Sequence, residues 1–159
     1  MISFSPAAEK KFQEIVARYP RKDAAMLPVL WLAQEEFEFI SPEVGKYVAE
    51  KLEVSVARVE SVIGFYTLYN TKKMGKYHLQ VCRNISCYLK GCKDVMDAIE
   101  TELHIKPGET TPDGKFTYSH VECLAACGNA PAMQVNMDYH ENLNAESVTQ
   151  LVVGLKGNL

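Results

Sequence analysis

Four of the five cysteines in this chain form two closely spaced pairs. Cys82 and Cys87 have four residues between them, Cys123 and Cys127 have three, and Cys92 is the fifth cysteine. An odd number of cysteines, in a chain that begins without the basic and apolar segments of an export signal, argues against a disulfide framework. Four thiolates are the ligand set that a [2Fe–2S] cluster needs. The two pairs therefore indicate a cluster in which each pair binds one iron.

Other interpretations of the same cysteines remain open at this point. Four thiolates at these spacings would also satisfy tetrahedral zinc, in a zinc-stapled interaction module, and spacing alone does not separate the two metals. A thiol–disulfide enzyme is disfavoured, because the chain has no Cys-x-x-Cys motif. The interpretation as unconnected core cysteines is weak, because it leaves the grouping of four cysteines in two loops to coincidence. A Rieske centre needs two histidine ligands, and no histidine lies within two residues of these cysteines.

The elements around the cysteines alternate between strand and helix. Alternating polarity over 77–82 predicts a strand that ends at Cys82, and a helix over 89–103 places Cys87 where it begins. Further strands are expected at 116–121, 132–137 and 139–143, with a turn beginning at Asp138. Asn144 then caps a last helix. The order β-α-β-β-β-α resembles that of the thioredoxin fold, and it places both pairs in loops at one end of the sheet.

The first 70 residues read as four short amphipathic helices. Ser5-Pro6 and Ser41-Pro42 each supply an N-cap followed by a proline, and Ser55 opens the fourth helix. The first helix is expected to end at Pro20. The second runs from about Ala24 to Phe37, and we expect Trp31 to be part of its core. Helices of this length, joined by short turns, form a small bundle.

A polar stretch over 71–75 separates the two patterns and reads as a linker. We therefore expect an α+β protein with a helical bundle domain over residues 1–72 and a thioredoxin-like α/β domain over 76–159. The composition is that of a folded chain, with 47% hydrophobic residues, 23% charged residues and a net charge of −3. Without a Lys/Arg stripe, we expect no nucleic-acid binding. The longest apolar run, 24–33, is too short for a membrane span, so we expect a cytoplasmic protein without direct membrane insertion.

Several residues near the pairs have a functional and a plain interpretation. Cys92 shares the apolar face of the helix that follows it, so we read it as a core side chain. Gly128 follows a candidate ligand, where a missing Cβ would let the backbone approach sulfur closely; it could equally make a turn. Arg83 and Lys90 could offset negative charge at a cluster or be ordinary surface charges. The four histidines show no ligand spacing.

The cysteine segments also carry a family resemblance. The segments Val81-Cys82, Cys87-Tyr88-Leu89-Lys90-Gly91 and Glu122-Cys123-Leu124-Ala125-Ala126-Cys127-Gly128-Asn129-Ala130-Pro131 closely resemble those of the thioredoxin-like [2Fe–2S] subunit of respiratory complex I, the E subunit of bacterial NADH:quinone oxidoreductase. Leu27-Pro28, Ala33-Gln34-Glu35-Glu36-Phe37, Ser41-Pro42 and Phe65-Tyr66-Thr67 extend the likeness over nearly the whole chain. Glu38 and Ala125 stand where many relatives would have glycine.

The resemblance implies a specific role. Cys82, Cys87, Cys123 and Cys127 would hold a [2Fe–2S] cluster that carries single electrons, and no catalytic residue is expected in this chain alone. The partner would be the flavoprotein subunit that binds NADH and FMN, in a complex on the cytoplasmic face of the inner membrane. Corresponding diaphorase subunits of NAD-linked hydrogenases or formate dehydrogenases look alike and remain the alternative.

Three further expectations accompany this role. No three of the nine glycines make Gly-x-Gly-x-x-Gly, so this chain lacks the dinucleotide fingerprint. The helical half, which carries no chemistry of its own, is the candidate for binding the partner. Pro131 lies where thioredoxin-like folds often place a cis-proline; because trans is the commoner isomer of X–Pro bonds, both isomers stay open.

Overall fold

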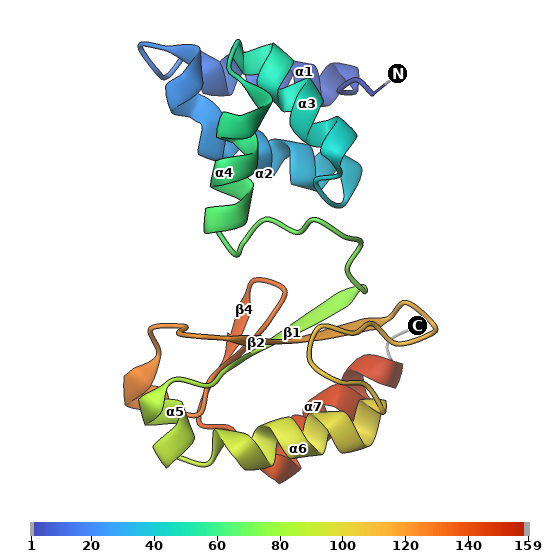
Figure 1. The fold of residues 1–159 in the computed structure, drawn as a ribbon. Helices are drawn as coiled ribbons and strands as arrows, with labels where there is room; N and C mark the ends of the chain where they lie inside the picture. Colours follow the sequence, from blue (N-terminus) through green and yellow to red (C-terminus); the bar gives the residue numbers. More distant parts are fainter. Residues whose placement is uncertain (1, 158–159) are drawn as a thin grey trace. The chain divides into compact units, whose positions relative to one another are not determined.

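The structure is a computed structural model that describes residues 2–157, so the outer bounds 1 and 159 of the two expected domains lie outside the described residues. The chain divides into two compact units, Met1–Lys73 and Met74–Leu159 (Figure 1). The first unit is entirely helical and the second contains the only sheet among the described residues. No helix within 2–157 has both the length and the apolar character needed to cross a membrane.

Serine caps begin three of the helices in the first unit. The side chains of Ser5, Ser41 and Ser55 accept hydrogen bonds from backbone N–H groups in the first turn of the helix that follows. These helices are α1 (Pro6–Val16), α3 (Pro42–Leu52) and α4 (Val56–Phe65). The second helix, α2 (Met26–Phe37), follows a short 3-10 turn, η1 (Lys22–Ala25). The predicted four-helix pattern is confirmed.

Two details of the helical prediction were wrong. Helix α1 ends at Val16, before Pro20, because residues 17–21 form turns rather than a further helical turn. Trp31 is only partly buried, and its Nε1 donates a hydrogen bond to Glu35 Oε1 on the outside of α2 (2.9 Å). An indole N–H needs such a partner, and the surface of the helix supplies it.

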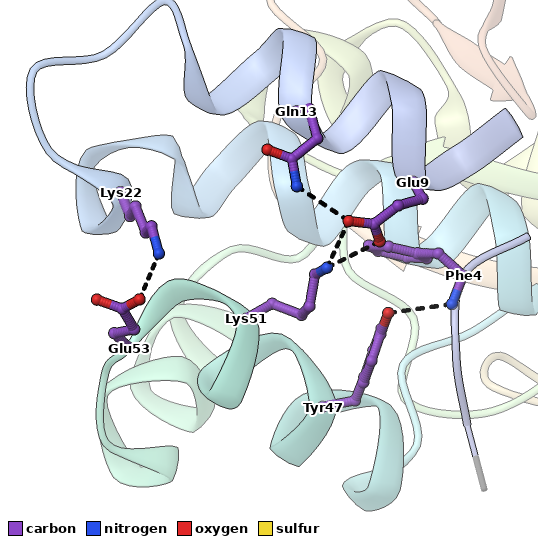
Figure 2. A network of polar contacts seen from close by, with 7 residues as sticks. All are labelled: Phe4, Glu9, Gln13, Lys22, Tyr47, Lys51 and Glu53. Carbon is purple, nitrogen blue, oxygen red and sulfur yellow. Dashed lines mark hydrogen bonds and ion pairs between the residues drawn. The ribbon is translucent and has the colours of Figure 1, made fainter. Parts of the chain in front are cut away.

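A polar network fastens α1 to α3 beside an aromatic core. Lys51 Nζ donates to both carboxylate oxygens of Glu9, at 2.7 and 2.8 Å, and Gln13 donates to the same carboxylate (Figure 2). The backbone N–H of Phe4 donates to the Tyr47 hydroxyl at 3.0 Å, and the two rings pack edge to face. The helical unit is therefore held by apolar packing with a few ion pairs around it.

The second unit is built on a four-stranded mixed sheet. Its strands are β1 (Tyr77–Cys82), β2 (Phe116–Val121), β3 (Met133–Val135) and β4 (Asp138–His140). Their order is β2-β1-β3-β4; β1 and β2 are parallel, and the other two pairings are antiparallel. The α+β class and the thioredoxin-like arrangement are as expected.

Helices α6 (Cys92–Leu103) and α7 (Ala145–Gly157) pack against each other and cover one face of this sheet (Figure 1). The core between the layers takes alternate residues of β1 and β2, including Leu79, Val81, Phe116 and Tyr118. The intervening side chains face away from this core, and His78 and Ser119 share a hydrogen bond of 2.8 Å there. The alternation that predicted the strands therefore reflects one apolar and one more polar face.

The predicted helix over 89–103 corresponds to α6, which begins three residues later than predicted. A short α5 (Ile85–Leu89) precedes α6, and Gly91 separates them with φ of +90°, a conformation that costs a residue with a Cβ much more than it costs glycine. Cys87 thus lies inside α5 rather than at the start of the long helix. Strands β3 and β4 are also shorter than predicted, because Asn136 and Met137 make the turn and Asp138 is already in β4.

Gly75 joins the linker to the sheet in a way that the sequence did not indicate. A Cβ at this position would meet backbone atoms of Lys115 and Phe116 at 2.7–2.9 Å. The N–H of Gly75 donates to Thr117 Oγ1 at 2.7 Å, and Thr117 is fully buried. The end of the expected linker is therefore packed against β2.

Candidate metal centre

The parallel pairing of β1 and β2 brings the cysteine-bearing loops to one end of the sheet. Cys82 is the last residue of β1 and pairs with Val121, the last residue of β2, so Cys123 follows two residues later. The N–H of Cys82 donates to the Ala132 carbonyl at 3.1 Å, which places the segment before β3 at the same end. Three segments distant in sequence thus converge here.

Three thiols form a small buried cluster at this end. Cys82, Cys87 and Cys92 are 3%, 2% and 0% exposed and lie with Leu124 and Ala132. The expectation that Cys92 is buried is confirmed. Its neighbours are nevertheless the thiols of the first pair, which its helical spacing did not reveal, because the break at Gly91 changes the direction of the chain.

The second pair is differently placed. Cys123 and Cys127 are both exposed, and Cys127 begins a short 3-10 turn, η2 (Cys127–Asn129). Within residues 2–157, no three His, Cys, Asp or Glu side chains lie close enough to share one metal ion. The structure thus brings Cys82 and Cys87 together and leaves the second pair in the neighbouring loop. A [2Fe–2S] cluster needs two thiolates per iron.

Backbone N–H groups point at two of the sulfurs. The N–H of Ala125 donates to Cys123 Sγ at 3.3 Å, and the N–H of Ala132 donates to Cys87 Sγ. Such donors stabilise the thiolate form that binds iron. Ala125 has a φ of +57° in this loop and is one of the two positions where glycine was expected. The donor set and the N–H groups fit a thiolate-bound cluster.

Burial opposes the charged form of the first pair. The pKa of the Cys87 thiol is raised to about 11, chiefly by burial and also by the nearby Cys82 sulfur, against the lowering effect of the Ala132 N–H. Burial also raises the pKa of the Cys92 thiol, and negative charge at Cys82 adds to this. At neutral pH the Cys87 thiol keeps its proton in the metal-free chain, so metal binding there must displace a proton.

The other residues singled out near the pairs have simpler surroundings. Arg83 Nε donates to Glu122 Oε1 at 3.0 Å, so this exposed ion pair links the residue after Cys82 to the residue before Cys123. Gly128 has no positive φ, and a Cβ there would meet no protein atom within 4 Å. The chain itself therefore does not require glycine at 128. The Ala130–Pro131 peptide bond is cis.

Sequence comparison identifies the class of protein that this fold and site define. The family model for the thioredoxin-like [2Fe-2S] ferredoxin matches residues 12–156. The chain belongs to this family, and its cofactor is a [2Fe–2S] cluster. Among curated relatives, the NADH-quinone oxidoreductase E subunit 2 of Rhizobium meliloti (strain 1021) is 44% identical over 143 residues, or 90% of this chain and 85% of the relative. The NADH-quinone oxidoreductase E subunit of Rickettsia felis (strain ATCC VR-1525 / URRWXCal2) is also 44% identical over 143 residues, or 88% and 86% of the two chains.

Solved structures confirm the fold. A chain of the NAD+-reducing [NiFe]-hydrogenase in its H2-reduced state superposes with a TM-score of 0.74, at 16% sequence identity. The match covers 84% of this chain and 22% of that chain. At this identity the likeness shows a shared architecture and no more.

Proposed function

We propose that this chain is the [2Fe–2S] electron-transfer subunit of an NADH-quinone oxidoreductase and holds its cluster through Cys82, Cys87, Cys123 and Cys127. The observation that carries the proposal is the parallel pairing of β1 with β2, which brings the two loops that carry the cysteine pairs to one end of a thioredoxin-like sheet. Relatives of matching length are E subunits of this enzyme. The chain contributes to an oxidoreductase and has no catalysis of its own.

Each pair supplies the two thiolates of one iron. Cys82 and Cys87 lie on a strand end and on α5, whereas Cys123 and Cys127 lie in one loop. A bound [2Fe–2S] cluster accepts and returns one electron at a time. This chain's part is to hold the sulfurs, to direct N–H groups toward them and to keep the first pair away from water.

The partner is a flavoprotein subunit that binds NADH and FMN. Hydride transfer moves two electrons, and a flavin is the usual converter between two-electron and one-electron chemistry. This chain lacks the glycine fingerprint for a dinucleotide, so the partner supplies both the nucleotide site and the flavin. As part of that complex, the chain is a peripheral subunit on the cytoplasmic face of the inner membrane.

The alternatives are less well supported. The hydrogenase likeness is one of fold at 16% identity, whereas the E subunits of NADH-quinone oxidoreductase are 40–44% identical over most of the chain. A structural zinc module does not agree with membership of a [2Fe–2S] family. Electron transfer within NADH-quinone oxidoreductase is therefore the function we propose.

The test is an EPR spectrum of the anaerobically purified chain after dithionite reduction. We expect a brown-red protein that contains two irons and two sulfides per chain and gives the signal of a reduced [2Fe–2S] cluster. A colourless protein that retains stoichiometric zinc would overturn the proposal.

A further inference from the structure

The loop that carries the second cysteine pair is attached to the rest of its unit through one buried residue. Residues 122–126 form the irregular segment between β2 and η2, with Cys123 inside it and Cys127 directly after it. Leu124 is the only buried residue of this segment, and its side chain packs into the small cluster that contains the thiols of the first pair. The position of Leu124 therefore relates the second pair to the first.

Tyr139 holds the backbone of Leu124 from the sheet. Its hydroxyl donates a hydrogen bond to the Leu124 carbonyl oxygen at 3.0 Å. Tyr139 is the middle residue of β4 and pairs with Gln134 of β3. The neighbours of Gln134, Met133 and Val135, are in the core that α6 and α7 cover. Because successive side chains of a strand point to opposite faces, Tyr139 reaches the loop from the face that these helices do not cover, and it is 50% exposed.

The segment after β4 holds the far end of the same loop. Asn129, the last residue of η2, donates from its side chain to Glu141 Oε2 at 2.7 Å, and the N–H of Asn142 donates to the Asn129 carbonyl oxygen at 2.7 Å. These two bonds lie beyond Cys127. Among the bonds from β4 and the segment after it, that of Tyr139 is the one that reaches a residue between the two proposed ligands.

We propose that Tyr139 is a positioning residue for the second cysteine pair. The inference rests on the proposed function and on its ligand set. The Tyr139 hydroxyl holds the Leu124 carbonyl, and the Leu124 side chain rests on the thiols of the first pair, so Cys123 and Cys127 are kept at one distance from that pair. A [2Fe–2S] cluster that takes two thiolates from each pair depends on this distance.

The experiment compares variants of the full chain that carry the reconstituted cluster. Tyr139→Phe removes the hydroxyl and keeps the ring. Tyr88→Phe is the matched control, because Tyr88 is exposed beside the proposed ligand Cys87 and its hydroxyl makes no hydrogen bond within residues 2–157. Val95→Ala is the control for lost stability, because Val95 is buried in the core between the sheet and the helices of the same unit. The measurements are the EPR line shape of the reduced cluster and the rate at which a chelator removes its iron.

We expect Tyr139→Phe to broaden the EPR signal, because the second pair then takes up a range of positions. Iron loss should be about two- to tenfold faster, which is the factor that corresponds to one net hydrogen bond. Tyr88→Phe should match the wild type in both measurements. Val95→Ala should leave the line shape unchanged, even where the lower stability of the unit speeds iron loss.

Leu124→Ala tests whether Tyr139 acts through Leu124. The loop has already lost its packing in the Leu124→Ala background, so Tyr139→Phe should add little to the broadening there, and an additive effect would contradict the inference. If Tyr139→Phe alone matches the wild type, or if either control variant broadens the signal equally, the inference is wrong while the cluster assignment stands. A wild-type chain that takes up no [2Fe–2S] cluster would overturn the inference and the proposed function together.

Discussion

The two units of this chain bury different kinds of side chain. The helical unit is packed with aliphatic and aromatic residues, and Phe4 contacts Phe12, Phe37 and Tyr47 at centroid distances of 5.1–6.0 Å. The α/β unit has an apolar core of the same kind and, apart from it, a cluster of buried thiols at the end of its sheet. The first unit is therefore stabilised by apolar packing, whereas the second unit also holds reactive thiol groups near the ends of its strands. The proposed chemistry of this chain therefore depends on the sheet.

The largest expected effect is the loss of the cluster from single substitutions in the α/β unit. Replacing Cys82, Cys87, Cys123 or Cys127 with Ala should abolish or badly destabilise the cluster, because four thiolates are required. Visible absorption, EPR and iron analysis measure the loss of the cluster. Cys92→Ala is the matched control and should retain the cluster, at the modest stability cost of a lost core side chain. A normal spectrum in any of the four ligand variants would contradict the assignment.

The second prediction separates the units. Residues 76–159 expressed alone should fold and hold the cluster, because all four proposed ligands and the whole sheet lie there. Deleting residues 1–70 should weaken binding to the flavoprotein while the EPR spectrum stays the same. The exposed Phe65 and Tyr66 at the end of α4 are apolar surface suited to such a contact. A fragment that binds metal only when the helical unit is present would show that the units are not independent.

A further part of this prediction concerns activity. The isolated chain should show no NADH:ferricyanide activity, and activity should appear only with the flavoprotein added, because we propose that the nucleotide site and the flavin belong to that partner. Catalytic reduction of the cluster by NADH in the flavin-free chain would contradict this division of roles.

Two glycines should respond oppositely to alanine. Gly75→Ala should destabilise the α/β unit by about 1–3 kcal/mol, because the new Cβ would overlap the backbone of residues 115 and 116. Gly64→Ala in α4 meets no atom within 4 Å and should stabilise the helical unit by about 0.5–1 kcal/mol. Loss of cluster absorbance in urea follows the second unit, and fluorescence of Trp31, the single tryptophan, follows the first. Equal effects from both substitutions would show that close approach at Gly75 is relieved by movement of the chain.

Glu38 in the first unit and Ala125 in the second unit both have a strained backbone conformation. Both have positive φ, of 69° and 57°, where an L-residue is disfavoured by about 1–2 kcal/mol. Glu38→Gly and Ala125→Gly should each recover about 1 kcal/mol of stability, less the entropy that glycine adds to the unfolded chain. Only Ala125→Gly should also alter the EPR line shape, because the Ala125 N–H donates to Cys123. A change in the spectrum of Glu38→Gly would contradict the separation of the two units.

The smallest expected effect concerns the ion pair of the helical unit. Hydrogen bonding from Lys51, and then from Gln13, lowers the pKa of Glu9 below its ordinary 4.5. The unfolded chain therefore takes up the Glu9 proton at a higher pH than the folded chain does. The contribution of the ion pair to the free energy of unfolding is complete above pH 4.5 and is lost as the pH falls through the folded pKa of Glu9. Because the pair is partly exposed, Glu9→Gln should cost only about 0.5 kcal/mol at pH 7 and less at lower pH.

Urea unfolding monitored by Trp31 fluorescence at several pH values measures this effect. Glu14→Gln is the matched control on the same helix, since the described residues show no ion pair at Glu14. If the loss of stability caused by Glu9→Gln does not change with pH, it comes from packing rather than from charge.

Most helices and strands were predictable because their signals are local. Ser5, Ser41 and Ser55 cap helices with their own side chains, and the alternation over 77–82 directly reflects which residues of β1 face the core. The spacing of the cysteine pairs likewise indicated two thiolates per loop. The break at Gly91, the turn at Asn136 and Met137, and the close approach at Gly75 were missed, because each depends on where a distant segment lies.

The sequence by itself determined the types of group available: two closely spaced pairs of cysteines in the second half of the chain, no cysteine in the helical half, and no Gly-x-Gly-x-x-Gly motif. These conclusions follow from residue type and spacing, which need no knowledge of distant contacts. Only the tertiary structure decided that Cys92 lies with Cys82 and Cys87, and that the N–H groups of Ala125 and Ala132 reach sulfurs. The physical reason is that the parallel pairing of β1 with β2 and the antiparallel pairing with β3 bring these segments to one end of the sheet. Local periodicity carries no information about which strand ends become neighbours.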